Sequence, residues 1–369
     1  MAERGNLLLR RLDRWLGIPL TGLTACTRLR HSRPPEVVRS IGLICLGAIG
    51  DLLLLSALTK SLRRTLPQVK LEAIVSRANA GAVSLLPGLD SHVAFAVHDV
   101  PSMIGHMRRR QYDVLLDSSQ WARLGAVLCN LSAARYTVGF DTKGQYRAAG
   151  YDYKVIHRND RHEVENFLAL GRALFPGLDD SPELILPTAP PDEALQLANF
   201  PRKIFLHMWP AGINAHLKEW PAKHWATLAR YLLDSGYRIF LSGSPADAAK
   251  NNAFLAEFFP AESRVCSLAG ILSLPALAWA LSRAQAVISV NTGTMHLAAL
   301  AGASTIGLHG ATNPLRWGPV GKQTASLLPR QGQFAYLNLG FEYPHNAEPA
   351  LAHLPPEDVL TVLQDWALL

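Results

Sequence analysis

Short apolar runs alternate with longer amphipathic stretches from about residue 40 to the end of the chain. Apolar runs of about four to eight residues are typical of buried strands, and the longer stretches repeat their apolar positions at helical spacing. Alternation of this kind predicts α/β domains, each with a parallel sheet covered by helices on both faces. The predicted strands are IGLICLG, KLEAIVS, HVAFAV, VLLDSS and YTVGF in the first half, and KIFLHMWP, YRIFLSGS, RVCSLAG, AVISV and STIGLHG in the second.

Helices are predicted between these strands, at 52–66, before LPGLD, through WARLGAVLCNL and at 222–235. The chain has 369 residues, more than one hydrophobic core usually holds, which predicts two domains. The stretch LPTAPPDEA is the most linker-like. We therefore expect an N-terminal extension at 1–39, a Rossmann-like domain at 40–186, a linker at 187–194, a second Rossmann-like domain at 195–345 and a closing C-terminal helix at 346–369.

The net charge of +7 is concentrated at the N-terminus, where residues 1–40 hold eight arginines and three acidic residues. Leucines and Trp15 are interleaved with these arginines, which is the composition of an amphipathic helix attracted to anionic lipid. A solvated arm or a helix packed on the body explains the pattern equally well. Nucleic acid is the weaker interpretation, because no known nucleic-acid-binding module is found.

No membrane span or secretion signal is expected. The most apolar stretch, 41–58, carries Asp51 and two glycines in its middle, and the N-terminus has arginines among its leucines and no cleavage site. The four cysteines lack disulfide or zinc spacing and are interpreted as free thiols in a reducing compartment. The sequence has no D-x-D, no metal-ligand cluster, and no G-x-S-x-G or Walker motif, which disfavours hydrolases and kinases.

Two glycine-containing motifs, LGAIGD at 46–51 and NTGTMH at 291–296, follow predicted strands and precede predicted helices. Ligands bind at the carboxyl ends of strands in open parallel sheets, and glycine turns at helix N-termini suit phosphate. Asp51 would repel a phosphate, so it is either a helix cap or a base. Tight turns are also common to all such folds, so the pattern alone leaves a purely structural role open.

Lys218 precedes Trp-Pro, and Pro221 can begin the next helix. A lysine held there is well placed to neutralise a pyrophosphate, although most lysines are simply solvated. His296 and His309 are lone histidines, and each is more typical of a hydrogen-bonded packing residue than of a ligand.

The ordered motifs together resemble glycosyltransferase family nine, the ADP-heptose:lipopolysaccharide heptosyltransferases. They are LGAIGDLLLLSAL, YDVLLDSS, PAGINAHLKEWPAKHWATLA, and the long stretch from SLAGILSLP through NTGTMHLAA to GATNP and a following GP. The resemblance covers about residues 40–345, and its C-terminal motif is the most specific part.

The resemblance implies a GT-B fold, in which two Rossmann-like domains face each other across a cleft. The first domain would take the acceptor and the second the nucleotide sugar. Asp51 corresponds to the general base and Lys218 to the phosphate-binding lysine. The donor-binding loops would contain Gly243, Asp247, Asn291, Thr292, Gly293 and His296. Many relatives have Asp where this chain has Asn291.

By this resemblance the chain is expected to be an inverting glycosyltransferase without cofactor or metal, which agrees with the missing D-x-D. The expected donor is ADP-heptose and the acceptor a lipopolysaccharide core or related glycolipid. Residues 1–39 would contact the anionic inner face of the inner membrane from the cytoplasm. The alternatives are another nucleotide-sugar donor, a protein or soluble glycan acceptor, or a degenerate protein that binds nucleotide sugar without transferring it.

Overall fold

The computed structural model describes residues 7–212 and 214–369, and the chain divides into two compact units, Met1–Leu184 and Ile185–Leu369. The division falls just before the stretch predicted as a linker. Each unit has its own hydrophobic core and its own six-stranded sheet.

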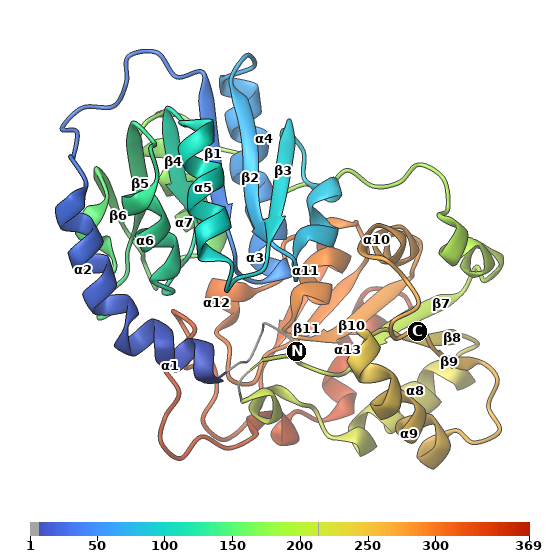
Figure 1. Ribbon diagram of the computed structural model, residues 1–369. Coiled ribbons are helices and arrows are strands. Elements are labelled where there is room, and N and C mark those ends of the chain that lie inside the picture. The colour runs from blue at the N-terminus through green and yellow to red at the C-terminus, as the bar shows by residue number, and fades with distance from the viewer. Residues whose placement is uncertain (1–6, 213) are drawn as a thin grey trace. The chain divides into compact units, whose positions relative to one another are not determined.

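The sheet of unit 1 is entirely parallel, in the order β3-β2-β1-β4-β5-β6 (Figure 1). Its strands are β1 Ser40–Cys45, β2 Lys70–Ser76, β3 Ser91–Phe95, β4 Val114–Asp117, β5 Tyr136–Asp141 and β6 Tyr153–Ile156. Its helices are α1 Leu7–Trp15, α2 Gly17–Thr27, α3 Ile49–Leu54, α4 Ser56–Thr65, α5 Val100–Arg110, α6 Leu124–Leu131 and α7 Glu163–Arg172, with the 3-10 turns η1 Ala80–Leu85 and η2 Ala148–Gly150.

The sheet of unit 2 repeats this arrangement, in the order β12-β11-β10-β7-β8-β9, again all parallel. Its strands are β7 Lys203–His207, β8 Arg238–Leu241, β9 Val265–Ser267, β10 Ala286–Val290, β11 Thr305–Leu308 and β12 Thr324–Leu327. Its helices are α8 Ala222–Asp234, α9 Ala248–Phe258, α10 Leu274–Ser282, α11 Gly293–Leu300, α12 Pro314–Trp317 and α13 Pro356–Asp365, with the 3-10 turns η3 Asp192–Asn199, η4 Ala215–Lys218, η5 Pro245–Asp247 and η6 Ala350–His353.

The strand order fixes where each unit can bind a ligand. In unit 1 the chain moves outward from β1 in one direction and from β4 in the other, so the crevice at their carboxyl ends is a switch point. The strands β7 and β10 form the equivalent point in unit 2. The predicted motifs LGAIGD and NTGTMH follow β1 and β10 directly.

Helices cover both faces of the first sheet, as the alternation predicted. The helices α4 and α7 pack together on one face, while α5 and α6 lie together in front of the other (Figure 1). The helix predicted at 52–66 is two helices, broken at Leu55, whose N–H reaches both Asp51 and Leu53 carbonyls. The helical stretch predicted before LPGLD is the 3-10 turn η1, and part of the predicted linker forms η3.

The N-terminal extension contains two helices, and the second packs on the body of unit 1. The Asn130 side-chain amide on α6 donates to the Thr21 carbonyl on α2 at 3.2 Å. Asp13 on α1 pairs with Arg123 at 2.8 Å, and Arg28 pairs with Asp152 at 2.7 Å. Within the described residues, none of the helices combines the length and apolar character that a bilayer crossing requires.

Candidate functional site

Asp51 lies one turn beyond the carboxyl end of β1, at the third residue of α3. Its Oδ2 accepts a hydrogen bond from the Ala48 N–H at 3.0 Å, which closes the turn at the helix start. Gly47 keeps this turn tight, because a Cβ there would lie only 3.0 Å from Asp51 Oδ2. The carboxylate is therefore both a helix cap and a partly exposed group at the switch point.

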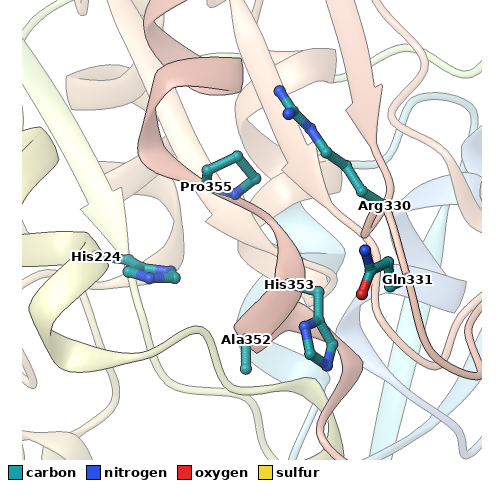
Figure 2. Close-up of a pocket in the computed structure, with 6 residues that line it drawn as sticks. All are labelled: His224, Arg330, Gln331, Ala352, His353 and Pro355. Atoms are coloured by element: carbon teal, nitrogen blue, oxygen red, sulfur yellow. The ribbon is translucent and has the colours of Figure 1, made fainter.

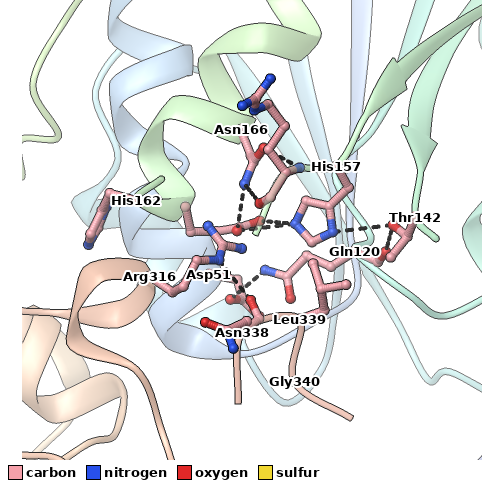
Figure 3. Close-up of polar contacts among 12 residues, drawn as sticks. Asp51, Gln120, Thr142, His157, His162, Asn166, Arg316, Asn338, Leu339 and Gly340 are labelled. Carbon is pink, nitrogen blue, oxygen red and sulfur yellow. Dashed lines mark hydrogen bonds and ion pairs between the residues drawn. The ribbon is translucent and has the colours of Figure 1, made fainter. Parts of the chain in front are cut away.

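Gln120 holds the other oxygen of this carboxylate. Its Nε2 donates to Asp51 Oδ1 at 3.0 Å from the loop after β4 (Figure 3). Asp117, the last residue of β4, holds this loop in place. Its Oδ1 accepts from the Ser119 N–H at 2.9 Å, and its Oδ2 pairs with the buried Arg147. The Ala48 N–H and the Gln120 amide are both donors, which suits an ionised carboxylate.

A buried chain of polar groups lies behind Gln120 (Figure 3). The Thr142 hydroxyl donates to the Gln120 backbone carbonyl, and its oxygen is 3.2 Å from His157 Nδ1. His157 Nε2 faces the Glu163 carboxylate at 3.0 and 3.1 Å, and the side chains of this pair are fully buried. The sequence analysis did not predict Gln120, Thr142, His157 or Glu163. For Gln120 one signal was available, since it is a polar residue just after the predicted strand β4.

Lys218 ends the 3-10 turn η4 that follows β7 in unit 2. Its Nζ donates to the Ala211 carbonyl at 3.2 Å, so the ammonium folds back toward the loop that leaves β7. Gly310, in the GATNP segment after β11, packs against this turn, since a Cβ there would lie 3.2 Å from the Leu217 carbonyl. The Lys218 turn and the GATNP segment therefore meet within unit 2.

Gly243 and Asp247 form the turn after β8. A Cβ at Gly243 would lie 2.9 Å from the Cβ of Asp247, so glycine lets the turn close. The Asp247 carboxylate accepts from the N–H and the hydroxyl of Ser244 at 2.8 and 2.7 Å. Its observed role is a cap of this turn, and a donor contact by Asp247 stays a prediction.

Asn291, Thr292 and Gly293 lead from β10 into α11. The Asn291 amide donates to the Trp317 carbonyl at 3.0 Å, which ties this loop to the end of α12. Thr292 is the N-cap residue in extended conformation, and within the described chain its side chain makes no capping bond to α11. The first N–H groups of the helix are thus without a side-chain cap, a condition that suits an anion.

Three histidines of unit 2 are buried: His207, His296 and His309. His296, in α11, is 4% exposed. A contact between His296 and the nucleotide sugar stays a prediction. His207 ends β7, and its Nδ1 lies 3.0 Å from the Ser242 hydroxyl at the end of β8. Burial lowers the pKa of His207 to about 4 and that of His309 to about 3, so both are neutral at physiological pH. His207 was not predicted, although it ends a strand at the switch point.

A surface cavity of about 290 Å³ in unit 2 contains none of the predicted residues (Figure 2). The cavity carries little free positive charge. Arg330 pairs with Asp358, and burial lowers the pKa of His224, which favours its neutral form. The described residues contain no cluster of three or more His, Cys, Asp or Glu that could hold a metal. The cysteines are free thiols, as expected. The residues that line the cavity are His224, Arg330, Gln331, Ala352, His353 and Pro355.

Residues 100–335 match the sequence model of glycosyltransferase family 9 (heptosyltransferase). The lipopolysaccharide core heptosyltransferase OpsX of Haemophilus influenzae is 25% identical over 299 residues, which are 77% of this chain and 82% of that protein. The relationship therefore extends over most of both chains.

Solved structures share the fold. The E. coli ADP-heptose lps heptosyltransferase II superposes with a TM-score of 0.70 at 19% identity, covering 89% of this chain and 98% of that one. The E. coli heptosyltransferase WaaC with ADP gives a TM-score of 0.67 at 20% identity, covering 88% and 99%. With two parallel-sheet α/β units, the chain has the predicted GT-B fold.

Proposed function

The chain belongs to glycosyltransferase family 9, the heptosyltransferase family, and is a heptosyltransferase-like enzyme. From this premise we propose that it transfers heptose from ADP-heptose to a lipopolysaccharide core or related glycolipid, with inversion and without a metal. The observation that carries the proposal is the Asp51 carboxylate, held at the switch point of unit 1 by the Ala48 N–H and the Gln120 amide.

Asp51 acts as the general base in this proposal. The acceptor hydroxyl oxygen bonds to the anomeric carbon on the face opposite the diphosphate, and the bond from that carbon to the diphosphate oxygen breaks. The hydroxyl proton passes to the Asp51 carboxylate. General base assistance of this kind contributes about 10²–10⁴-fold to rate. The Ala48 N–H and the Gln120 amide orient the carboxylate for this role.

The departing diphosphate requires positive charge in unit 2. Lys218 supplies an ammonium from the end of η4, and α11 supplies N–H groups that no side chain caps in the described structure. Together they stabilise the negative charge that develops on the leaving group. These groups can perform that role without a metal, which supports the metal-independent mechanism.

We also propose that the N-terminal helices contact the anionic cytoplasmic face of the inner membrane. The pair α1 and α2 is anchored to unit 1, yet it exposes large apolar side chains: Trp15 is 75% exposed and Leu23 is 66% exposed. Arginines of the same segment supply the charge complementarity to acidic lipid. A glycolipid acceptor would be presented at such a surface.

The proposal is tested by titrating ADP, UDP, GDP and CMP into the protein by calorimetry, with and without Mg²⁺, followed by a transfer assay with ADP-heptose. Tight binding of ADP that Mg²⁺ does not alter, together with an inverted anomeric product, is the expected result. Preference for another nucleotide would overturn the donor assignment. Binding without any transfer to lipopolysaccharide core, protein or soluble glycan would indicate a degenerate transferase.

A further inference from the structure

The buried pair His157 and Glu163 is connected to the Asp51 carboxylate through two other residues of unit 1. The Thr142 hydroxyl links the imidazole to the Gln120 backbone, and the Gln120 side chain reaches Asp51. Glu163 and Thr142 are at most 1% exposed and His157 is 4% exposed, so water does not substitute for these contacts. An unpaired buried polar group is costly, which makes such a network rigid when every member is satisfied.

The donors and acceptors available in these groups fix the direction of each hydrogen bond between Glu163 and Gln120. A backbone carbonyl only accepts, so the single Thr142 proton points to Gln120, and His157 Nδ1 must donate to the Thr142 oxygen. His157 Nε2 faces both oxygens of Glu163, so another proton lies between them. Asn166 donates to the same carboxylate at 3.1 Å. Glu163 therefore fixes the orientation of the ring through Nε2, and the Thr142 oxygen accepts from Nδ1.

We propose that His157, Glu163 and Thr142 are positioning residues that hold Gln120, and through it Asp51, in the geometry that proton removal requires. The contacts that the structure describes link these three residues to Asp51 through Gln120. This inference rests on the proposed role of Asp51 as base. Small displacements of a catalytic group lower turnover by up to about 10²-fold without abolishing the fold.

A second histidine–glutamate pair in the same unit serves as a matched control. His106 Nε2 lies 3.0 Å from Glu72 Oε2, and Glu72 pairs in register with Gly42 in the amino-terminal half of β1. This pair is thus at the other end of the strands from Asp51. Replacing His106 removes a histidine–glutamate contact in which Glu72 is buried and His106 is partly buried, without touching the Gln120 loop.

The test compares Thr142→Val, Thr142→Ser, His157→Gln and His106→Gln by kcat, donor Kd and thermal unfolding. We expect Thr142→Val and His157→Gln to lower kcat by about 10- to 100-fold with unchanged donor Kd. Thr142→Ser keeps the hydroxyl and should retain most turnover, while His106→Gln should lower only the unfolding temperature. Equal kcat for Thr142→Val and Thr142→Ser would overturn the inference, even if His157→Gln fails to fold.

Asp51→Asn, measured in the same assay, separates this inference from the proposed function. If Asp51→Asn keeps turnover, the base assignment itself fails. If Asp51→Asn loses turnover while Thr142→Val matches wild type in kcat, Asp51 remains the base and the positioning network is wrong.

Discussion

The Gln120 side chain donates to the Asp51 carboxylate at 3.0 Å across 69 positions of sequence. The contact exists because β1 and β4 are adjacent parallel strands, so the loops after them meet at one edge of the sheet. Without Gln120, Asp51 Oδ1 would lose a side-chain donor that helps to orient the carboxylate. The two strands thus assemble the candidate base from separate parts of the chain.

Asp51→Asn should lower kcat by about 10²–10⁴-fold, because the amide cannot accept the acceptor hydroxyl proton. Its similar shape should preserve the fold, and donor affinity measured by calorimetry should stay near wild type. The exposed Asp160, paired on the surface with Arg158, offers Asp160→Asn as a control without an effect on turnover. Near-normal turnover in Asp51→Asn would rule out the base.

Lys218→Ala should weaken ADP binding and also lower kcat, by about 10²-fold if the ammonium stabilises the leaving diphosphate. Both effects are expected because the charge contacts the phosphate in the ground state and more strongly in the transition state. Lys223→Ala, which removes an exposed lysine on the neighbouring α8, is the matched control. If the two variants bind ADP alike, Lys218 does not contact the phosphates.

The triple variant Trp15→Ser, Leu16→Ser, Leu23→Ser should co-sediment less with vesicles of anionic phosphatidylglycerol than the wild-type protein does. The reason is that exposed apolar side chains insert into the lipid interface. A control with serine at Leu195 and Ile271, which are 50% and 56% exposed in unit 2, should sediment as wild type. Substitution is preferable to deleting 1–35, since deletion would uncover the α6 face that α2 packs against. Unchanged sedimentation of the triple variant would contradict lipid contact.

Acid should destabilise unit 2 through His207. The pKa of this histidine is lowered to about 4 in the folded protein by burial, from 6.5 ordinarily, so the unfolded chain binds a proton that the folded chain excludes. The free energy of unfolding should therefore fall as pH drops from about 6.5 toward 4, by on the order of 3 kcal/mol. Denaturant unfolding of wild type and His207→Asn measures this, and an equal pH slope for both would exclude His207 as the source.

Local pattern was sufficient for most of the architecture. Strand runs and helical spacing depend on neighbouring residues, so the α/β alternation, the helix at 222–235 and the terminal helix α13 could be predicted. The break at Leu55 could not, because it depends on carbonyl partners within a continuous helical pattern. The strands β6 and β12 were not predicted either, since they are edge strands of only four residues each, too short for a clear periodic pattern.

The sequence by itself determined that this is a two-unit GT-B chain of glycosyltransferase family 9, because the order of the motifs and the periodicity of apolar residues can be read without a structure. It also singled out Asp51 and Lys218 as candidates. Only the tertiary structure decided what surrounds them: Gln120 on Asp51, the Glu163–His157–Thr142 network behind it, and the packing of α2 on α6. Such contacts join residues far apart in sequence, and sheet pairing and close packing, rather than local preference, select them.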